Sequence, residues 1–166
     1  MLLSRRDYLL RIIDEAGRML ARAVNRRGAG AAEEALDAIV RGCERLFGLE
    51  MHELFQFNAE QQYAMLIDVP DREVARNRVL MYAALNLEAG RVYQASGKSP
   101  LARTTWIQAL RLRLRAQLEF SPDNLPAWAP AIAHLRTALG DGPLDPDTAA
   151  LLAAAEADQK PPPAAG

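Results

Sequence analysis

The residues best suited to chemistry in this chain are two histidines, one cysteine and a short acidic segment. Glu50, His52 and Glu53 lie close enough in sequence to suggest a metal site. They lack the two-histidine helical spacing or the cysteine partners that make such a site specific. His134 lies far from them and belongs to no recognisable motif. We therefore expect a non-enzymatic protein with no metal, no cofactor and no catalytic residue.

The single cysteine, Cys43, excludes an intramolecular disulfide. It falls in the apolar stripe of a predicted helix, where an unpaired thiol behaves as a small hydrophobic group. A reactive thiol would need a nearby base, and His52 is a weak candidate for that role. The sequence favours a buried, structural cysteine.

Arginines concentrate between residues 103 and 115. Binding through phosphate contacts needs a continuous positive surface, whereas the formal net charge of the chain is -1. In the predicted helix over 100–119, Arg113 falls inside the apolar arc, as does Gln117. These two side chains are either polar contacts in a groove or dimer interface, or structural groups. In the structural alternative, the arginine stem covers the edge of the core or its guanidinium pairs with Glu88.

Length and composition predict one helical domain. The chain has 166 residues, half of them hydrophobic and only 6% aromatic, and alanine and leucine supply much of the apolar content. Arg5 and Arg6 interrupt the apolar start, and no apolar stretch approaches the roughly 20 residues that span a bilayer. We expect a cytoplasmic protein with no membrane segment, a domain over 1–157 and a disordered Pro/Ala tail over 158–166.

Apolar residues recur at helical spacing through most of the domain. The alternation over 110–115 has the period of a strand, but its apolar flanks favour a helix. The helix over 71–96 is apolar on more than one face, which is typical of a central helix packed on two sides. The predicted helices span 7–25, 31–47, 71–96, 100–119, 124–138 and 146–157, with two short helices within 49–69.

Several helix starts carry capping signals. Asn58, with a glutamine three residues later, has the pattern of a capping box. Ser99 and Asp145 each precede a proline, which predicts a side-chain cap followed by a first-turn proline. Pro130 is expected to kink or break the helix over 124–138.

One segment has the spacing of a helix–turn–helix repeat. Gly90 and Tyr93 are followed by Ala102 and Trp106, which places small residues where two helices approach and aromatic rings beside them. This pattern resembles a tetratricopeptide repeat. The opening segment 7–13 is also similar to that of a bacterial tetratricopeptide-like family of unknown function, and the resemblance covers residues 7–118.

The resemblance implies an all-α fold, in which antiparallel helical hairpins of tetratricopeptide type form a short solenoid with C-terminal capping helices. It also implies a groove for peptides, with exposed positions near Leu87, Arg91 and Gln94. Together with Arg113 and Gln117, these residues form the predicted binding site. The lysine and asparagine pattern that clamps a peptide's terminal carboxylate is absent.

We expect an interaction scaffold or adaptor that binds a protein or peptide partner, or a second copy of itself in a homodimer. The alternative is a regulatory domain that binds a small ligand or nucleic acid through the arginine-rich helix 103–115. The near-neutral net charge disfavours nucleic acid as the partner.

Overall fold

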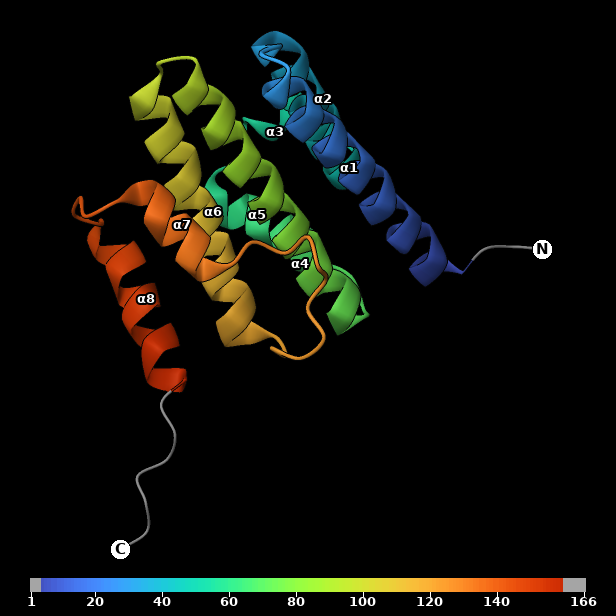
Figure 1. Cartoon of the computed structure of the whole chain (residues 1–166). Coiled ribbons are helices and arrows are strands. Elements are labelled where there is room, and N and C mark those ends of the chain that lie inside the picture. Colours follow the sequence, from blue (N-terminus) through green and yellow to red (C-terminus); the bar gives the residue numbers. More distant parts are fainter. Residues whose placement is uncertain (1–3, 160–166) are drawn as a thin grey trace, which may run out of the picture.

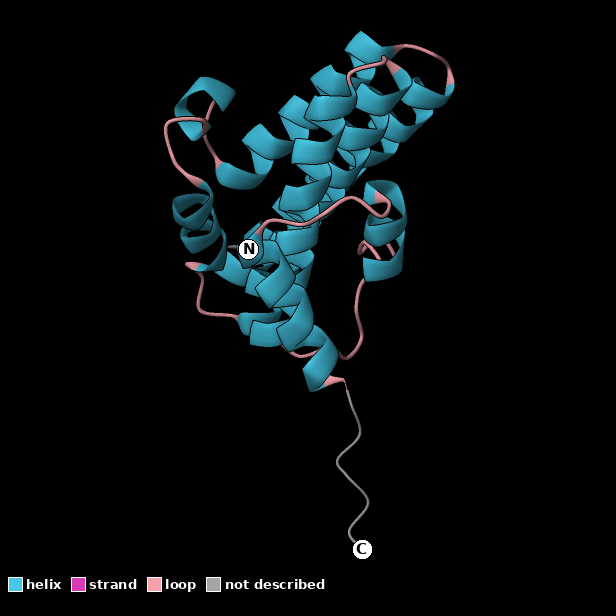
Figure 2. Ribbon diagram, turned by 90° about the vertical axis from the view of Figure 1, so that its left-hand side faces the viewer, coloured by secondary structure: helices cyan, strands magenta, loops and turns pink. Residues whose placement is uncertain are grey.

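The computed structural model describes residues 4–159, and all regular structure in this range is helical (Figures 1 and 2). The all-α prediction is therefore confirmed. No helix in this range is long and apolar enough to cross a membrane. The helices are α1 (Arg5–Gly28), α2 (Ala32–Phe47), α3 (Met51–Leu54), α4 (Ala59–Ile67), α5 (Arg72–Ala95), α6 (Ser99–Glu119), α7 (Ile132–Leu139) and α8 (Pro146–Asp158).

Helix α5 lies at the centre of the molecule. The α1–α2 hairpin packs on one side of it, and α6 packs on the other side, followed outward by α7 and α8 (Figure 1). Helix α4 also packs on α5. Every residue from Arg78 to Gly90 is buried, because neighbours surround this part of α5. The prediction of a central helix packed on two sides is confirmed.

Helices α5 and α6 are in close contact at Gly90. A methyl group at this position would lie 2.2 Å from the indole nitrogen of Trp106, so only glycine leaves room for the ring. The indole N–H donates a hydrogen bond to the Leu87 carbonyl oxygen at 3.1 Å. Ala102, on the same side of α6, is fully buried. Small residues therefore lie at this contact, as the sequence predicts.

Most predicted helix starts form as expected. Asn58 and Gln61 make the reciprocal capping box, with two N–H···O bonds of 2.8 Å. Asp145 accepts a hydrogen bond from the Thr148 N–H at 3.1 Å, which caps α8. The prediction for Ser99 is wrong, since this residue is already helical and its side chain makes no cap. The backbone N–H of the preceding residue, Lys98, donates to the Tyr93 carbonyl in the last turn of α5 at 2.8 Å, and α6 begins immediately after it.

The predicted helix over 124–138 is wrong in its first half. Helix α7 begins at Ile132, and Pro130 marks a complete break. The loop before it contains Asn124 with φ 53°, which a helix cannot hold. The loop carbonyls of Ser121 and Asp123 accept hydrogen bonds from the Arg76 guanidinium, at 3.0 and 2.8 Å, in place of the backbone N–H groups of a helix.

The predicted tail falls mostly outside the described residues. Asp158 belongs to α8, and 160–166 lie beyond the part of the chain that the structure describes.

Candidate binding cleft

The predicted groove positions on α5 have different surroundings from those expected. Leu87 is buried in the core that surrounds Trp106, so its predicted exposure is wrong. Arg91 is exposed, and its guanidinium lies 3.5 Å from Glu88, a carboxylate buried between helices. Gln94 is exposed on the last turn of α5. Leu87 therefore belongs to the core and Arg91 to a surface ion pair, so this face of α5 is not an open groove.

Arg113 lies in the interior. Its Nε donates to the Pro130 carbonyl at 2.8 Å, and burial, followed by the charge of nearby Arg76, lowers the pKa of the guanidinium. It does not pair with Glu88, whose ion pairs are with Arg27 and Arg91. This environment supports the structural alternative, in which Arg113 fixes the loop before α7.

Gln117 lies away from the other predicted site residues. It is half-buried and lines a separate hollow of about 270 Å³ between α6, α7 and α8. The five predicted residues are therefore not brought together into one site.

The other arginines of α6 bind the chain's own elements. Arg103 donates to the Leu139 and Pro143 carbonyls at 3.2 and 2.7 Å, and Arg111 lies 3.5 Å from Asp145. These contacts attach the α7–α8 segment to α6. The basic helix therefore presents no continuous row of free cations for phosphate groups.

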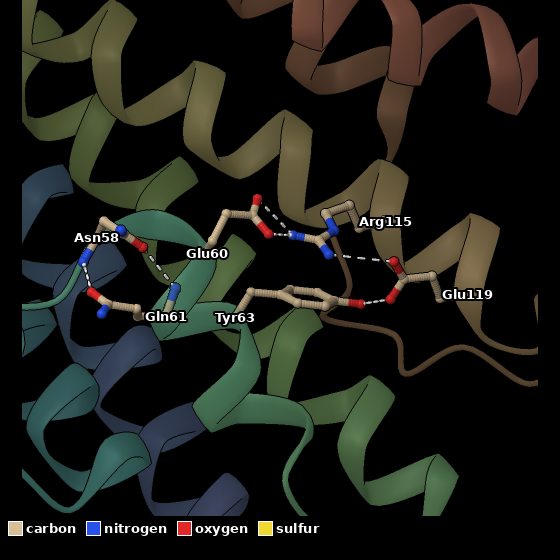
Figure 3. A network of polar contacts seen from close by, with 6 residues as sticks. All are labelled: Asn58, Glu60, Gln61, Tyr63, Arg115 and Glu119. Atoms are coloured by element: carbon tan, nitrogen blue, oxygen red, sulfur yellow. Dashed lines mark hydrogen bonds and ion pairs between the residues drawn. The ribbon is translucent and has the colours of Figure 1, made fainter.

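Arg115 holds α4 against α6 (Figure 3). Its guanidinium lies 3.5 Å above the Tyr63 ring and donates to both Glu60 carboxylate oxygens at 2.9 and 3.0 Å. Glu119 lies 3.4 Å from the same guanidinium and accepts a hydrogen bond from the Tyr63 hydroxyl. Through Arg115, this face of α6 is therefore linked to α4.

The acidic segment around His52 has a structural explanation. The ligand atoms of Glu50, His52 and Glu53 lie within 4.8 Å of one another, and all three residues are exposed. The Glu50 and Glu53 side chains form the capping box of α3. The two acidic residues are therefore explained by their role at the start of α3.

An apolar cleft of about 340 Å³ opens on the other side of α5 from Leu87. Helix α2 lines one side, α5 forms the floor, Thr105 of α6 lines the other side, and the α3 segment contributes two residues. Most of its lining is aliphatic, aromatic or sulfur-containing. The lining residues are Leu36, Ile39, Val40, Cys43, Met51, Phe55, Tyr82, Leu85, Asn86, Ala89, Tyr93 and Thr105.

Helix α4 occupies the continuation of this cleft. It covers the first half of α5, where the Tyr82 hydroxyl donates to Gln62 of α4 at 2.8 Å. Gln62 in turn donates to the Leu54 and Phe57 carbonyls at 3.2 and 3.1 Å, which fixes the connector before α4. Asn86, Ala89 and Tyr93 follow on the same face of α5 and line the open part.

Few polar groups face the cleft. Asn86, 9% exposed, donates from its amide nitrogen to the Tyr82 carbonyl at 2.9 Å. Among the described residues, the amide oxygen of Asn86 and the hydroxyl of Tyr93 have no hydrogen-bond partner. The Asn86 amide oxygen is not among the fully enclosed polar atoms without a partner, so it faces the open cleft as an acceptor that a bound group can use.

Apolar surface continues outside the cleft. Phe55, which forms part of the lining, is 71% exposed, and Leu101 on α6 is 49% exposed. An exposed aromatic ring beside an apolar hollow is a feature of binding surfaces. The helical patterns did not identify this site, because three separate helices form it.

Cys43 lies in the wall of the cleft as a buried thiol. Burial raises its pKa to about 12, so the thiol is protonated at neutral pH. The prediction of a buried cysteine is confirmed.

Comparisons of the chain with protein-family models, curated proteins and solved structures found no match.

We expect stability to fall at alkaline pH. Burial is the main cause that raises the pKa of Cys43 and also of Tyr63 and Tyr82, so folding favours their neutral forms. This stabilisation is complete below the unfolded pKa values, about 8.5 for a thiol and about 10 for a phenol, and is lost as the pH rises above them. Urea unfolding at pH 7 and pH 10 measures the loss. Equal midpoints at the two pH values would contradict this expectation.

Proposed function

We propose that this protein is a non-enzymatic interaction module that binds an apolar segment of another protein in the cleft between α2, α5 and α6. The observation that carries the proposal is the open apolar cleft with Phe55 exposed beside it. Interfaces of this kind take a few apolar anchor side chains into a central hollow, surrounded by further contacts.

The extent of the apolar surface favours a protein segment over a small ligand. A cleft of about 340 Å³ lies at the small end of ligand pockets. A small molecule within it would leave Phe55 and Leu101 uncovered, whereas a protein segment covers them as well.

The order of the helices supports a short tetratricopeptide-like arrangement. The α1–α2 and α5–α6 hairpins are the two units, and Gly90 gives the close contact within the second. Helices α3 and α4 form an insertion between the units, and α7 and α8 cover the outer side of α6. The proposed cleft lies between the second helix of one unit and both helices of the next.

Selection of peptides on the full-length chain tests this function. Random displayed peptides of about 16 residues, roughly four helical turns, are enriched on the wild-type protein and then on Ala89→Phe. The phenylalanine ring fills the cleft from its floor, so we expect peptides that bind the wild type and are lost on the variant. Failure to find any cleft-dependent peptide contradicts the proposed function.

Phe55→Ser is the matched second variant, because it removes an exposed ring and should leave the fold unchanged. We expect its free energy of unfolding to stay within about 0.5 kcal/mol of the wild-type value. Selected peptides should bind it more weakly. Unchanged binding would show that the peptides do not use this surface.

Light scattering tests whether the partner is a second copy. If the wild type is a dimer and Phe55→Ser is a monomer, the cleft binds a second copy of the chain. That result would overturn the proposal of a different protein as the partner.

A further inference from the structure

We infer that the occupant of the cleft is an amphipathic α-helix with basic residues beside its apolar face. This inference rests on the proposed function and adds the conformation and charge of the partner segment. It follows from three features of the groove, which are the helix it already holds, the unpaired acceptor on its floor and the charges along its edges.

The groove already holds one helix. On the α2 side, the Arg78 guanidinium donates to the Leu46 carbonyl of α2 and the Leu66 carbonyl of α4, at 3.3 and 2.9 Å. On the α6 side, Arg115 binds Glu60 of α4. Helix α4 therefore lies between the two walls, so the groove is wide enough for a helix. The cleft continues this groove along α5 beyond the end that α4 fills.

The floor of the cleft selects how a helix would present its side chains. A helix places residues i, i+3, i+4 and i+7 against such a groove, which suits an apolar floor of Leu85 and Ala89. The Asn86 amide nitrogen donates to the Tyr82 carbonyl, and the amide oxygen is left facing the cleft as an available acceptor. Backbone N–H groups inside a helix are already bonded, so the donor to this oxygen would be a side-chain N–H or O–H of the occupant.

The two edges of the cleft differ in charge. On α2, Glu33 and Asp37 are exposed and lie one turn from the lining residues Leu36 and Val40. Asp37 pairs with Arg41, one turn further along the same side of α2, at 3.0 Å, whereas Glu33 has no ion pair among the described residues.

The opposite edge, on α6, is uncharged where it faces the cleft. Leu101 is exposed there, Thr105 lines the cleft, and Gln108 lies one turn further along. An occupant that is complementary to both edges carries its positive charge on the α2 side.

The selected peptides provide the first test. Among those that bind the wild type and are lost on Ala89→Phe, we expect apolar residues at helical spacing with Lys or Arg between them. Alternating, proline-rich or acidic peptides that still depend on the cleft would overturn this inference and leave the proposed function in place. The absence of cleft-dependent peptides would remove both.

Charge reversal provides the second test, with a fluorescent synthetic copy of the leading peptide as the probe. We expect Glu33→Lys/Asp37→Lys to weaken binding about fivefold or more at low salt, and the difference to shrink at about 0.5 M salt. The control, Asp14→Lys/Asp158→Lys, has the same change in net charge on α1 and α8, away from the cleft. Equal affinities for the two variants would overturn the assigned charge of the partner.

Circular dichroism of the probe provides the third test. We expect its helical signal to increase when the full-length protein is added, because the groove stabilises the helical form. A bound probe with no gain in helicity would overturn the assigned conformation.

Discussion

Trp106→Ala is expected to lower the free energy of unfolding by about 3–5 kcal/mol, as for other large aromatic residues removed from a core. The ring fills the space over Gly90, and its N–H satisfies the Leu87 carbonyl at 3.1 Å. Alanine would leave a cavity between α5 and α6 and remove this hydrogen bond. Urea unfolding followed by circular dichroism measures the change, and a near-wild-type midpoint would contradict the assigned packing.

Gly90→Ala tests the same contact from the other helix. The new methyl group would overlap the indole ring, and such overpacking costs about 1–3 kcal/mol, more than the gain of up to about 1 kcal/mol in helix propensity. In the double variant with Trp106→Ala the methyl group has room. We therefore expect the two losses to be less than additive, whereas full additivity would indicate that these residues do not touch.

Arg78→Met is expected to cost about 2–4 kcal/mol, because it leaves buried carbonyl groups without donors. The guanidinium donates to Leu46 in the last turn of α2 and to Met65 and Leu66 in the last turn of α4. Carbonyls in a last turn have no partner within their own helix. Burial lowers the pKa of Arg78, and the negative ends of the two helices favour its charged form.

Two further variants test this explanation. Arg78→Lys keeps the positive charge but loses the planar fork, so it should recover only part of the stability. Arg41→Met removes an exposed arginine with a single surface ion pair, and should change stability by no more than about 0.5 kcal/mol. Equal effects of Arg78→Met and Arg41→Met in urea unfolding would contradict the structural role of Arg78.

Local rules predicted the features that depend on neighbouring residues. The capping box at Asn58 and the Asp145 cap need only residues three positions apart, and both form as expected. The contact between Gly90 and Trp106 was predictable from repeat spacing, since both lie on one hairpin.

Features that depend on distant residues could not be predicted in this way. The loop before α7 has the apolar spacing of a helix, but Arg76 and Arg113 reach it from α5 and α6 and bind its carbonyls. Nothing in the sequence distinguishes these two arginines from arginines on a solvent-exposed helix face. The error over 124–138 therefore reflects tertiary hydrogen bonds that override local preference.

The cleft was missed for a related reason. Helix α5 is apolar on several sides, and its sequence does not indicate which side remains uncovered once α1, α2, α4 and α6 have packed. The groove prediction chose the side of Leu87, which Trp106 covers. Two signals pointed to the other side, namely Asn86 inside an apolar run and Phe55 in a connector without helical periodicity.

The position of α8 at the edge of the molecule has a consequence for how the fold opens. This helix packs mainly on α6, whereas α5 is enclosed by four other helices. Fewer contacts must break to release α8, so its amide protons should exchange with deuterium through a local opening. Those in the middle of α5 should exchange only when the whole domain unfolds.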